Sequence, residues 1–312
     1  MTPDEMLARL LYRDGMMLVV DKPAGLSVHR GPKGGASLED YFDVLRFGLP
    51  RMPALAHRLD KDTSGCLVLG RHRKALALLG KLFKNGQIGK TYWAVVEGGP
   101  AEDEGRVDMP LGKLDEDRGW WMKPDADGKP ASTLWKVMGR FSFPSPEGGG
   151  SLAEPLAKAG GVGESSQHAA SLTPPGSLTL ATLPLQGKDK NNFTWLALQP
   201  LTGRTHQLRL HCAELGFPIV GDPIYGNAPR VGGPPLHLHS REIVVPISKN
   251  KPAIVTQAPV PRHMHEMLGK CGWEASPDRP HAEERSEGAR LEAEAAPSFE
   301  TRPAAAPQDE AD

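Results

Sequence analysis

Two long stretches of this chain contain almost no aromatic side chains, and they limit what the rest of it can fold into. Residues 143–192 are rich in Gly, Ser, Ala and Pro, and residues 274–312 consist mainly of Ala, Glu, Pro and Arg. Neither stretch can bury enough apolar surface to offset the entropy of ordering its backbone. We therefore expect a flexible insertion at 143–192, with at most a strand at 178–185, and a disordered tail at 274–312. Residues 1–142 and 193–273 would then form a single domain.

The apolar segments of the chain are short, and its cysteines are few. No apolar stretch approaches the roughly 20 residues that span a bilayer, and the N-terminus lacks the apolar core of a secretion signal. The three cysteines, Cys66, Cys212 and Cys271, are far apart in the sequence, which fits a reducing compartment. These features predict a cytoplasmic protein that does not interact with membranes.

The net charge of −1 conceals an uneven distribution of charge. The tail carries eleven acids against four arginines, a net charge of −7, so residues 1–273 carry +6. A basic body would attract a polyanion such as a nucleic acid, with the acidic tail held apart from it. A charge of +6 over 273 residues is also compatible with no such partner.

Apolar periodicity predicts an alternation of strands and helices in the two ordered parts. Short apolar or β-branched runs predict strands, and apolar residues spaced by three or four predict helices, the second of which would end at Gly216. The strands are expected at 16–20, 66–70, 90–97, 193–198 and 242–247, and the helices at 73–84 and 205–215.

A polar nonapeptide, HRLDKDTSG at 57–65, directly precedes a predicted buried strand. A carboxylate flanked by Arg58 and Lys61 would stay ionised at neutral pH and could act as a nucleophile or a base. The same residues could instead form a loop in which Asp60 or Asp62 accepts hydrogen bonds from backbone N–H groups. The nonapeptide by itself favours the loop interpretation.

A second polar motif, TGRTHQLRLH at 202–211, opens the predicted helix at 205–215. Gly203 permits a tight turn, and Arg204 at the helix start suits phosphate capture together with free backbone N–H groups. Arg209 could point inward against a carboxylate. His206 and His211 are five residues apart, which is poor spacing for metal ligands on a helix, and His237 with His239 does not change this, so we predict no metal site. Phosphate binding and a core helix both remain open for this motif.

Taken together, the motifs resemble those of the RluA-type pseudouridine synthases. HRLDKDTSG, KTYWAVVEG, LQPLTGRTHQLRLH and GFPIVGDPIYG follow that family's order and approximate spacing. Upstream VVDKPAGLSVHRG resembles its first motif, GKPASTLWKV its middle strand, and LHLHSREIVV its closing segment. The resemblance covers about residues 12–142 and 193–262. The chain starts almost at the first motif, so we expect no S4 RNA-binding module before it.

The resemblance implies an α+β fold with a mixed, largely antiparallel β-sheet flanked by helices and loops. It also implies an isomerase that converts uridine in RNA to pseudouridine without metal or cofactor. The expected partner is a stem-loop of tRNA or of 23S-type rRNA, and we expect the protein to be a monomer. Two alternatives stay open: a catalytically silent RNA-binding protein on the same fold, and a hydrolase of glycosides or nucleosides that uses Asp60 with a second acid.

Several residues acquire roles through the resemblance. Asp60 would be the catalytic carboxylate, Tyr92 would line the uracil pocket and take part in proton transfer, and Arg209 would pair with Asp60. Asp62 falls at a variable position and receives no role. The residues expected to bind the substrate or the RNA backbone are Arg58, which would fill the space left by a flipped-out nucleotide, and Arg204, Lys22, Lys90, His29, His57, Thr63 and Leu238.

Overall fold

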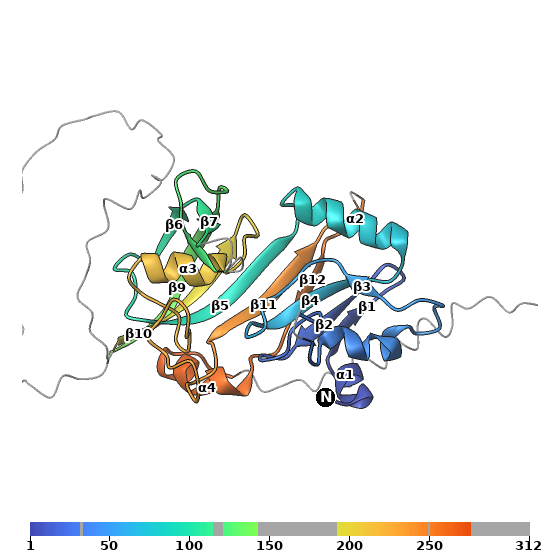
Figure 1. Cartoon of the computed structure of the whole chain (residues 1–312), viewed down its shortest axis with the longest axis horizontal. Helices are drawn as coiled ribbons and strands as arrows, with labels where there is room; N and C mark the ends of the chain where they lie inside the picture. Colours follow the sequence, from blue (N-terminus) through green and yellow to red (C-terminus); the bar gives the residue numbers. More distant parts are fainter. Residues whose placement is uncertain (32–33, 115–120, 143–191, 249, 276–312) are drawn as a thin grey trace, which may run out of the picture. The chain divides into compact units, whose positions relative to one another are not determined.

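The computed structural model describes residues 1–31, 34–114, 121–142, 192–248 and 250–275 (Figure 1). Met1–Trp273 form one unit, and Glu274–Asp312 form a second. The strand predicted at 178–185 lies outside the described residues, as does nearly all of the predicted insertion and tail. None of the described helices is long and apolar enough to cross a membrane.

The first unit is organised around one mixed sheet, which confirms the predicted fold class. Among the described residues, its strands run in the order β1-β2-β4-β11-β5-β10-β9-β6, with β3 beside β4 and β12 beside β11. All of these neighbours are antiparallel except β4 and β11, which are parallel. The strands of this sheet are β1 Leu10–Arg13, β2 Met17–Lys22, β3 Ala54–Leu55, β4 Ser64–Gly70, β5 Gly89–Glu97, β6 Glu104–Asp108, β9 Ser132–Ser142, β10 Asn192–Pro200, β11 Leu238–Val245 and β12 Ile254–Gln257.

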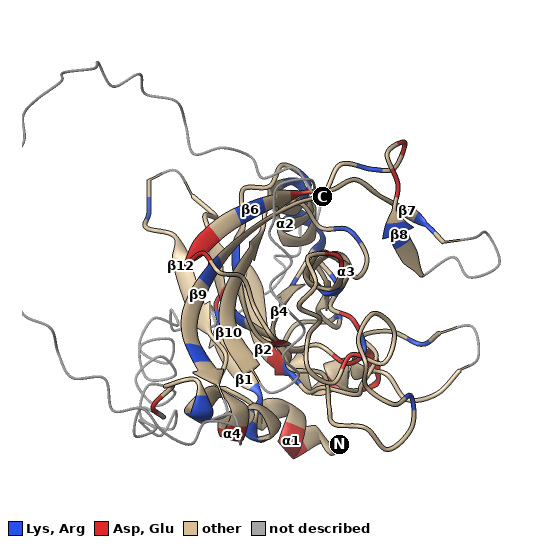
Figure 2. Cartoon of the chain, turned by 90° about the vertical axis from the view of Figure 1, so that its left-hand side faces the viewer, with Lys and Arg blue, Asp and Glu red and all other residues tan. Residues whose placement is uncertain are grey.

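A small hairpin stands apart from the main sheet. Its strands β7 (Leu111–Lys113) and β8 (Met122–Pro124) pair only with each other among the described strands, and they lie beside α3 (Figure 2). The hairpin is tied to the main body by the backbone N–H of Met122, which donates to the Tyr225 hydroxyl at 3.0 Å. This contact lies close to the candidate active site.

Successive side chains of a strand point to opposite faces of the sheet. Both faces of this sheet carry apolar side chains, and helices cover both of them. On β4, Leu67 and Leu69 pack into the core beneath α1 and the 3₁₀ helix η1, whereas Cys66 and Val68 face α2. On β5 the same alternation directs one face toward α3 and the other toward α4. The helices are α1 Pro3–Ala8, η1 Leu38–Leu45, α2 Arg73–Lys84, α3 Gln207–Glu214 and α4 Arg262–Lys270.

A close backbone approach fixes the parallel contact between β4 and β11. Gly65 has φ +102°, and a Cβ atom at this position would lie 2.2 Å from the backbone oxygen of Ser240 on β11. Only glycine combines that backbone conformation with so close an approach. The TSG end of the polar nonapeptide thus joins β4 to β11 and anchors the loop that carries Asp60.

Candidate active site

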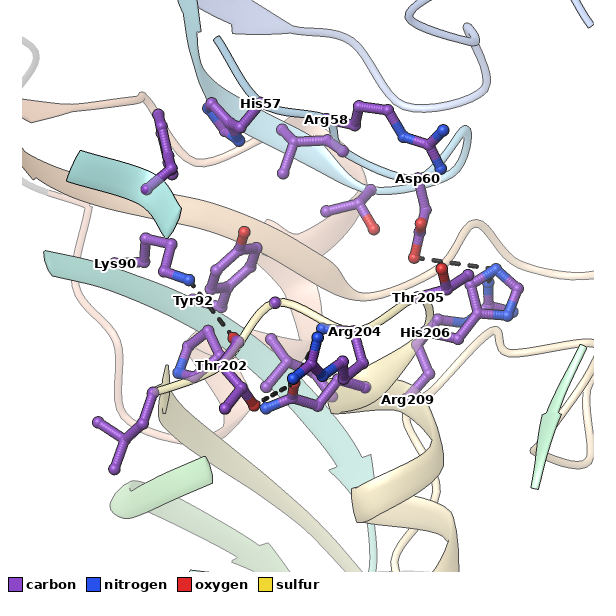
Figure 3. Close-up of a pocket in the computed structure, with 18 of the residues that line it drawn as sticks. His57, Arg58, Asp60, Lys90, Tyr92, Thr202, Arg204, Thr205, His206 and Arg209 are labelled. Atoms are coloured by element: carbon purple, nitrogen blue, oxygen red, sulfur yellow. Dashed lines mark hydrogen bonds and ion pairs between the residues drawn. The ribbon is translucent and has the colours of Figure 1, made fainter. Parts of the chain in front are cut away.

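The polar motifs of the sequence meet in one cavity of about 570 Å³ between α2 and α3 (Figure 3). In Figure 1 these two helices lie on either side of the middle strands β5 and β11. The loop before β4 forms one wall, and the segment that enters α3 forms the opposite wall. The residues predicted for the site that line it are Asp60, Tyr92, Arg209, Arg58, Arg204, His57, Thr63, Lys90 and Leu238.

Asp60 and Asp62 point into different spaces, although the spacing within the nonapeptide does not distinguish them. Asp60 lines the cavity described above, and its side chain is 29% exposed. Asp62 lines a separate hollow between the N-terminal strands and the proline-rich segment before β11. The backbone N–H of Thr63 donates to the Asp60 carbonyl at 3.2 Å, which closes a turn between the two carboxylates. Of these two acids, Asp60 alone is placed to meet a substrate in this cavity.

Lys22 lies buried behind the loop that carries Asp60 and binds its backbone. The prediction that Lys22 contacts RNA phosphate is therefore wrong. Its side chain is 0% exposed, so no phosphate can reach it. Its ammonium donates to the backbone carbonyls of Pro23, Lys61 and Thr63 at 2.7–2.8 Å. Burial lowers the pKa of Lys22 to about 8, which leaves the group charged at neutral pH. Lys22 therefore fixes the backbone that directly follows Asp60 in the loop.

Replacing Lys22 with methionine is expected to lower the free energy of unfolding by about 2–4 kcal/mol, because three buried carbonyls lose their donor. Lys61→Met is the matched control, since Lys61 is exposed, and surface substitutions of this kind change stability by about 0.5 kcal/mol or less. Urea denaturation of both variants measures the difference. Equal stability of the two variants would contradict a structural role for Lys22.

Tyr92 forms the floor of the cavity from β5. Its ring is 9% exposed and belongs to the central apolar core together with Leu238 at the start of β11. Burial raises the pKa of Tyr92, and the nearby Asp60 charge raises it further, although a hydrogen bond with Ser240 opposes both effects. The phenol consequently keeps its proton at neutral pH, so it can donate a hydrogen bond but is poorly suited to act as a base.

Arg209 pairs with Asp222 rather than with Asp60. Its Nε donates to Asp222 Oδ2 at 2.8 Å and its Nη2 to Oδ1 at 2.6 Å, and both side chains are almost fully buried. Burial alone raises the pKa of Asp222, but the hydrogen bonds and charge of Arg209, with two backbone N–H donors, outweigh it and hold the pKa below its usual value. Arg209 still lines the Asp60 cavity, and its charge acts on Asp60 across it.

His206 lines the cavity, although the sequence motifs predicted no catalytic or binding role for it. It precedes α3 in the left-handed conformation, with φ +52°. Its Nε2 lies 3.9 Å from Asp60 Oδ2, and its Nδ1 lies 3.0 Å from the Tyr225 hydroxyl. Burial lowers the pKa of His206 below its usual value, although the charge of Asp60 acts in the opposite direction. A neutral imidazole therefore faces the candidate catalytic carboxylate.

The histidine of the nonapeptide and the arginine before α3 have structural bonds of their own. His57 stacks on Phe83 and accepts a hydrogen bond from the Val68 N–H. Burial, followed by the charge of Lys90, lowers the pKa of His57 to about 3, so it carries no charge for a phosphate. The Arg204 N–H donates to Gln207 Oε1, so this N–H is not available to a phosphate.

The remaining predicted contacts differ in accessibility. Arg58 is exposed at the cavity rim, and Lys90 is half-buried with its ammonium 3.5 Å from the Thr202 carbonyl. Thr63 is buried, and its hydroxyl has no hydrogen-bond partner among the described residues. His29 is not among the described residues that line the cavity. Within the same described ranges, no group of three or more potential ligands is arranged to hold a metal ion.

Comparison with known proteins identifies the family. Residues 16–214 match the family described as RNA pseudouridylate synthase. An uncharacterized RNA pseudouridine synthase of Zymomonas mobilis is 36% identical over 258 residues, covering 81% of this chain and 94% of that protein. RNA pseudouridine synthase 4, mitochondrial, of Arabidopsis thaliana is 32% identical over 70% of this chain and 40% of that protein.

Solved structures support the same fold. The human RNA pseudouridylate synthase domain containing 4 superposes with a TM-score of 0.60 and 22% identity, covering 88% of this chain and 96% of that one. The human RNA pseudouridylate synthase domain containing 1 gives a TM-score of 0.55 at 20% identity. With the motifs and the family match, these findings show that the chain belongs to the RluA-type RNA pseudouridylate synthase family and is an RNA pseudouridine synthase.

Proposed function

We propose that this enzyme isomerises specific uridines of tRNA or large-subunit rRNA and that Asp60 is its catalytic carboxylate. The observation that carries the proposal is the convergence of Asp60, Tyr92 and Arg209 on one cavity. The volume of this cavity falls within the range of small-molecule sites. A single flipped-out nucleoside would therefore fit into the cavity.

The reaction requires little besides positioning and one carboxylate. The N1–C1′ bond of uridine breaks, the uracil turns, a C5–C1′ bond forms, C5 loses a proton and N1 gains one. Asp60 would assist in one of two ways. It would attack C1′ to form an ester that C5 displaces when the C5–C1′ bond forms, or it would remove the C2′ proton to give a glycal and return that proton when the C5–C1′ bond forms. Tyr92 would lie against the base and donate a hydrogen bond, because its raised pKa keeps the phenol protonated. We therefore assign the proton-accepting role to Asp60 and not to Tyr92.

Arg209 and its partner Asp222 would act on Asp60 through charge. The guanidinium of Arg209 lies near enough to attract the Asp60 carboxylate electrostatically. The bidentate bond with Asp222 prevents Arg209 from turning into the substrate space. Arg209 would thus provide a fixed positive charge beside Asp60 while leaving the carboxylate oxygens available to the nucleoside.

RNA would lie across the mouth of the cavity. Arg58 on the first wall and Arg204 on the opposite wall present cations there, and Lys90 lies deeper. Such contacts with the phosphate backbone position RNA without reading its sequence, so binding should weaken as salt rises. An exposed loop uridine is the substrate that this arrangement fits best, because RNA recognition relies on shape and on unstacked loop bases.

We also propose that the protein acts as a monomer in the cytoplasm. The three cysteines are buried and unpaired, which fits a reducing compartment. A catalytically silent RNA-binding protein is the alternative, and the presence of Asp60, Tyr92 and Arg209 in one cavity disfavours it.

Mapping pseudouridines in total RNA from cells with and without this gene tests the proposal and identifies the substrate. We expect one or a few sites in tRNA or large-subunit rRNA to lose pseudouridine in the deletion strain. Expression of the intact chain should restore them. Unchanged pseudouridine in both RNA classes would refute the proposed substrates.

A further inference from the structure

His206 lies between the candidate catalytic carboxylate and a network of fixed groups behind it. Its Nε2 is 3.9 Å from Asp60 Oδ2 and 3.5 Å from Arg209 Nη1. Its Nδ1 is 3.0 Å from the hydroxyl of Tyr225, whose ring stands edge-on to the imidazole. The ring is only 9% exposed and faces the Asp60 cavity. None of the roles assigned above uses this residue.

The hydrogen-bond partners of His206 define its tautomer. The guanidinium of Arg209 has donors only, so its contact with Nε2 requires a lone pair on that nitrogen. The ring proton of the neutral imidazole then resides on Nδ1 and is donated to the Tyr225 hydroxyl. That hydroxyl also accepts the Met122 N–H from β8, which fills its two acceptor positions. In this tautomer the Nε2 lone pair faces the Arg209 guanidinium at the edge of the cavity, and the Tyr225 hydroxyl keeps its own proton.

The backbone of His206 supports a built arrangement. Its φ of +52° lies in the left-handed region, which a residue with a Cβ atom adopts only when its surroundings impose it. Tyr225 follows Asp222 closely in the sequence, and its backbone N–H donates to the Asp222 carboxylate. The ion pair of Arg209 and Asp222 therefore holds the partner of His206 as well.

We propose that His206 is a positioning residue for Asp60, and that its Nε2 accepts a hydrogen bond from the Asp60 carboxylic acid formed during the reaction. This inference rests on the proposed function. The C5–H bond of the turned uracil breaks, its electron pair stays in the ring, and the proton moves to Asp60 Oδ2. A small rotation of the Asp60 side chain from 3.9 Å brings the new O–H to Nε2. There it replaces Arg209 Nη1, now at 3.5 Å, as the donor to the single lone pair of that nitrogen. The proton later leaves Asp60 for N1 or for solvent, and the enzyme is restored.

Protonation of His206 would remove this function, because an imidazolium has no lone pair to offer. The charged groups that act on the ring are Asp60, Asp62 and Asp222, which favour protonation, and Arg209, which opposes it. Burial also opposes protonation. The enzyme should thus be active with a neutral His206 and lose activity as the pH falls and the ring becomes charged.

The kinetic test uses His206→Ala and His206→Gln in single-turnover reactions on RNA from cells lacking the gene. His206→Ala should lower the rate at saturating enzyme by about 10- to 100-fold. The enzyme concentration for half-maximal rate should change by less than about two-fold, because His206 stabilises a reaction step and not bound RNA. His206→Gln offers an amide oxygen as acceptor and should recover part of the rate.

The pH profile separates positioning from mere structural support. The acid-side loss of rate in the parent enzyme should move to lower pH in His206→Gln, since the amide does not titrate. His211→Gln is the matched control: His211 is buried on the same helix but contacts Thr133 and Met109. It should retain the acid-side profile of the parent. An unchanged profile in His206→Gln, or equal rate losses in the alanine variants of His206 and His211, would overturn the proposal.

A second measurement needs no RNA and therefore separates this inference from the proposed function. Nitrogen-15 NMR of histidine-labelled protein at neutral pH should show His206 with an unprotonated Nε2 and a protonated Nδ1. Tyr225→Phe, which keeps the ring and removes the hydroxyl, should alter that signal. An imidazolium, or a proton on Nε2, would refute the assignment whatever the activity of the enzyme.

Discussion

Replacing Asp60 with asparagine is expected to lower the rate of pseudouridine formation by about 10³-fold or more. The amide has nearly the shape of the carboxylate, but it can neither attack C1′ nor take up a substrate proton. The fold should be unaffected, because the Asp60 side chain is 29% exposed and His206, 3.9 Å away, is held neutral by its lowered pKa. Comparing single-turnover rates of the two proteins on RNA from cells lacking the gene measures the effect.

Asp62→Asn is the matched control for this experiment. Asp62 is two residues away in the same loop but lines the other hollow. Its rate should stay within about three-fold of the parent, and RNA affinity should be similar in both variants. Retained activity in Asp60→Asn would remove Asp60 from the mechanism. Loss of RNA binding together with activity would indicate a binding role instead.

Replacing Asp222 with asparagine is expected to lower the free energy of unfolding by about 3–5 kcal/mol. The substitution leaves the buried guanidinium of Arg209 without a counter-charge in a place where water cannot replace it. For a unit of this size the loss corresponds to a fall in melting temperature of roughly 10 °C. Differential scanning calorimetry of the two proteins measures it.

An exposed ion pair provides the control for the buried one. Glu266→Gln breaks the contact with Lys270 on α4, where the carboxylate is 77% exposed, and should cost about 0.5 kcal/mol or less. A similar loss of stability in both variants would show that burial does not increase the contribution of the Arg209–Asp222 pair to the free energy of unfolding.

The stability contributed by Asp222 should depend on pH in a defined direction. Its pKa is lower in the folded protein than its ordinary value of 3.8, so the folded state favours the ionised form. The contribution is fully present above the unfolded value and is lost as the pH falls toward the folded value. The difference in melting temperature between the parent and Asp222→Asn should therefore stay constant near neutrality and shrink below about pH 4.

Local patterns predicted the regular elements well where apolar spacing was clear. The helix predicted at 73–84 coincides with α2, and the strand predicted at 90–97 lies within β5. The strand predicted at 242–247 begins earlier, at Leu238, because His239 and Ser240 are buried between β4 and β5 despite their polarity. No pattern had indicated α4, whose contacts with the sheet are made far away in the sequence.

The sequence motifs predicted most of the residues that line the candidate site, but not His206 and not the contacts among them. Sequence motifs pointed to Asp60, Tyr92 and Arg209, and the fold brings all three to one cavity. The partner of Arg209 was missed, although Asp222 stands within the GFPIVGDPIYG motif, where a buried arginine would need a carboxylate. Lys22 was assigned to RNA because a lysine is usually exposed, and its burial depends on three carbonyls that no linear pattern reveals.

The most direct test of the account follows one atom of the substrate. RNA from cells lacking the gene, labelled with tritium at C5 of uridine, is incubated with the purified chain, and both released tritium and free uracil are measured. Breaking the C5–H bond without losing the base predicts one tritium released per pseudouridine formed, no free uracil, and no release with Asp60→Asn. Release of free uracil would indicate a hydrolase, and the absence of tritium release from RNA known to contain the target uridine would contradict the isomerase mechanism.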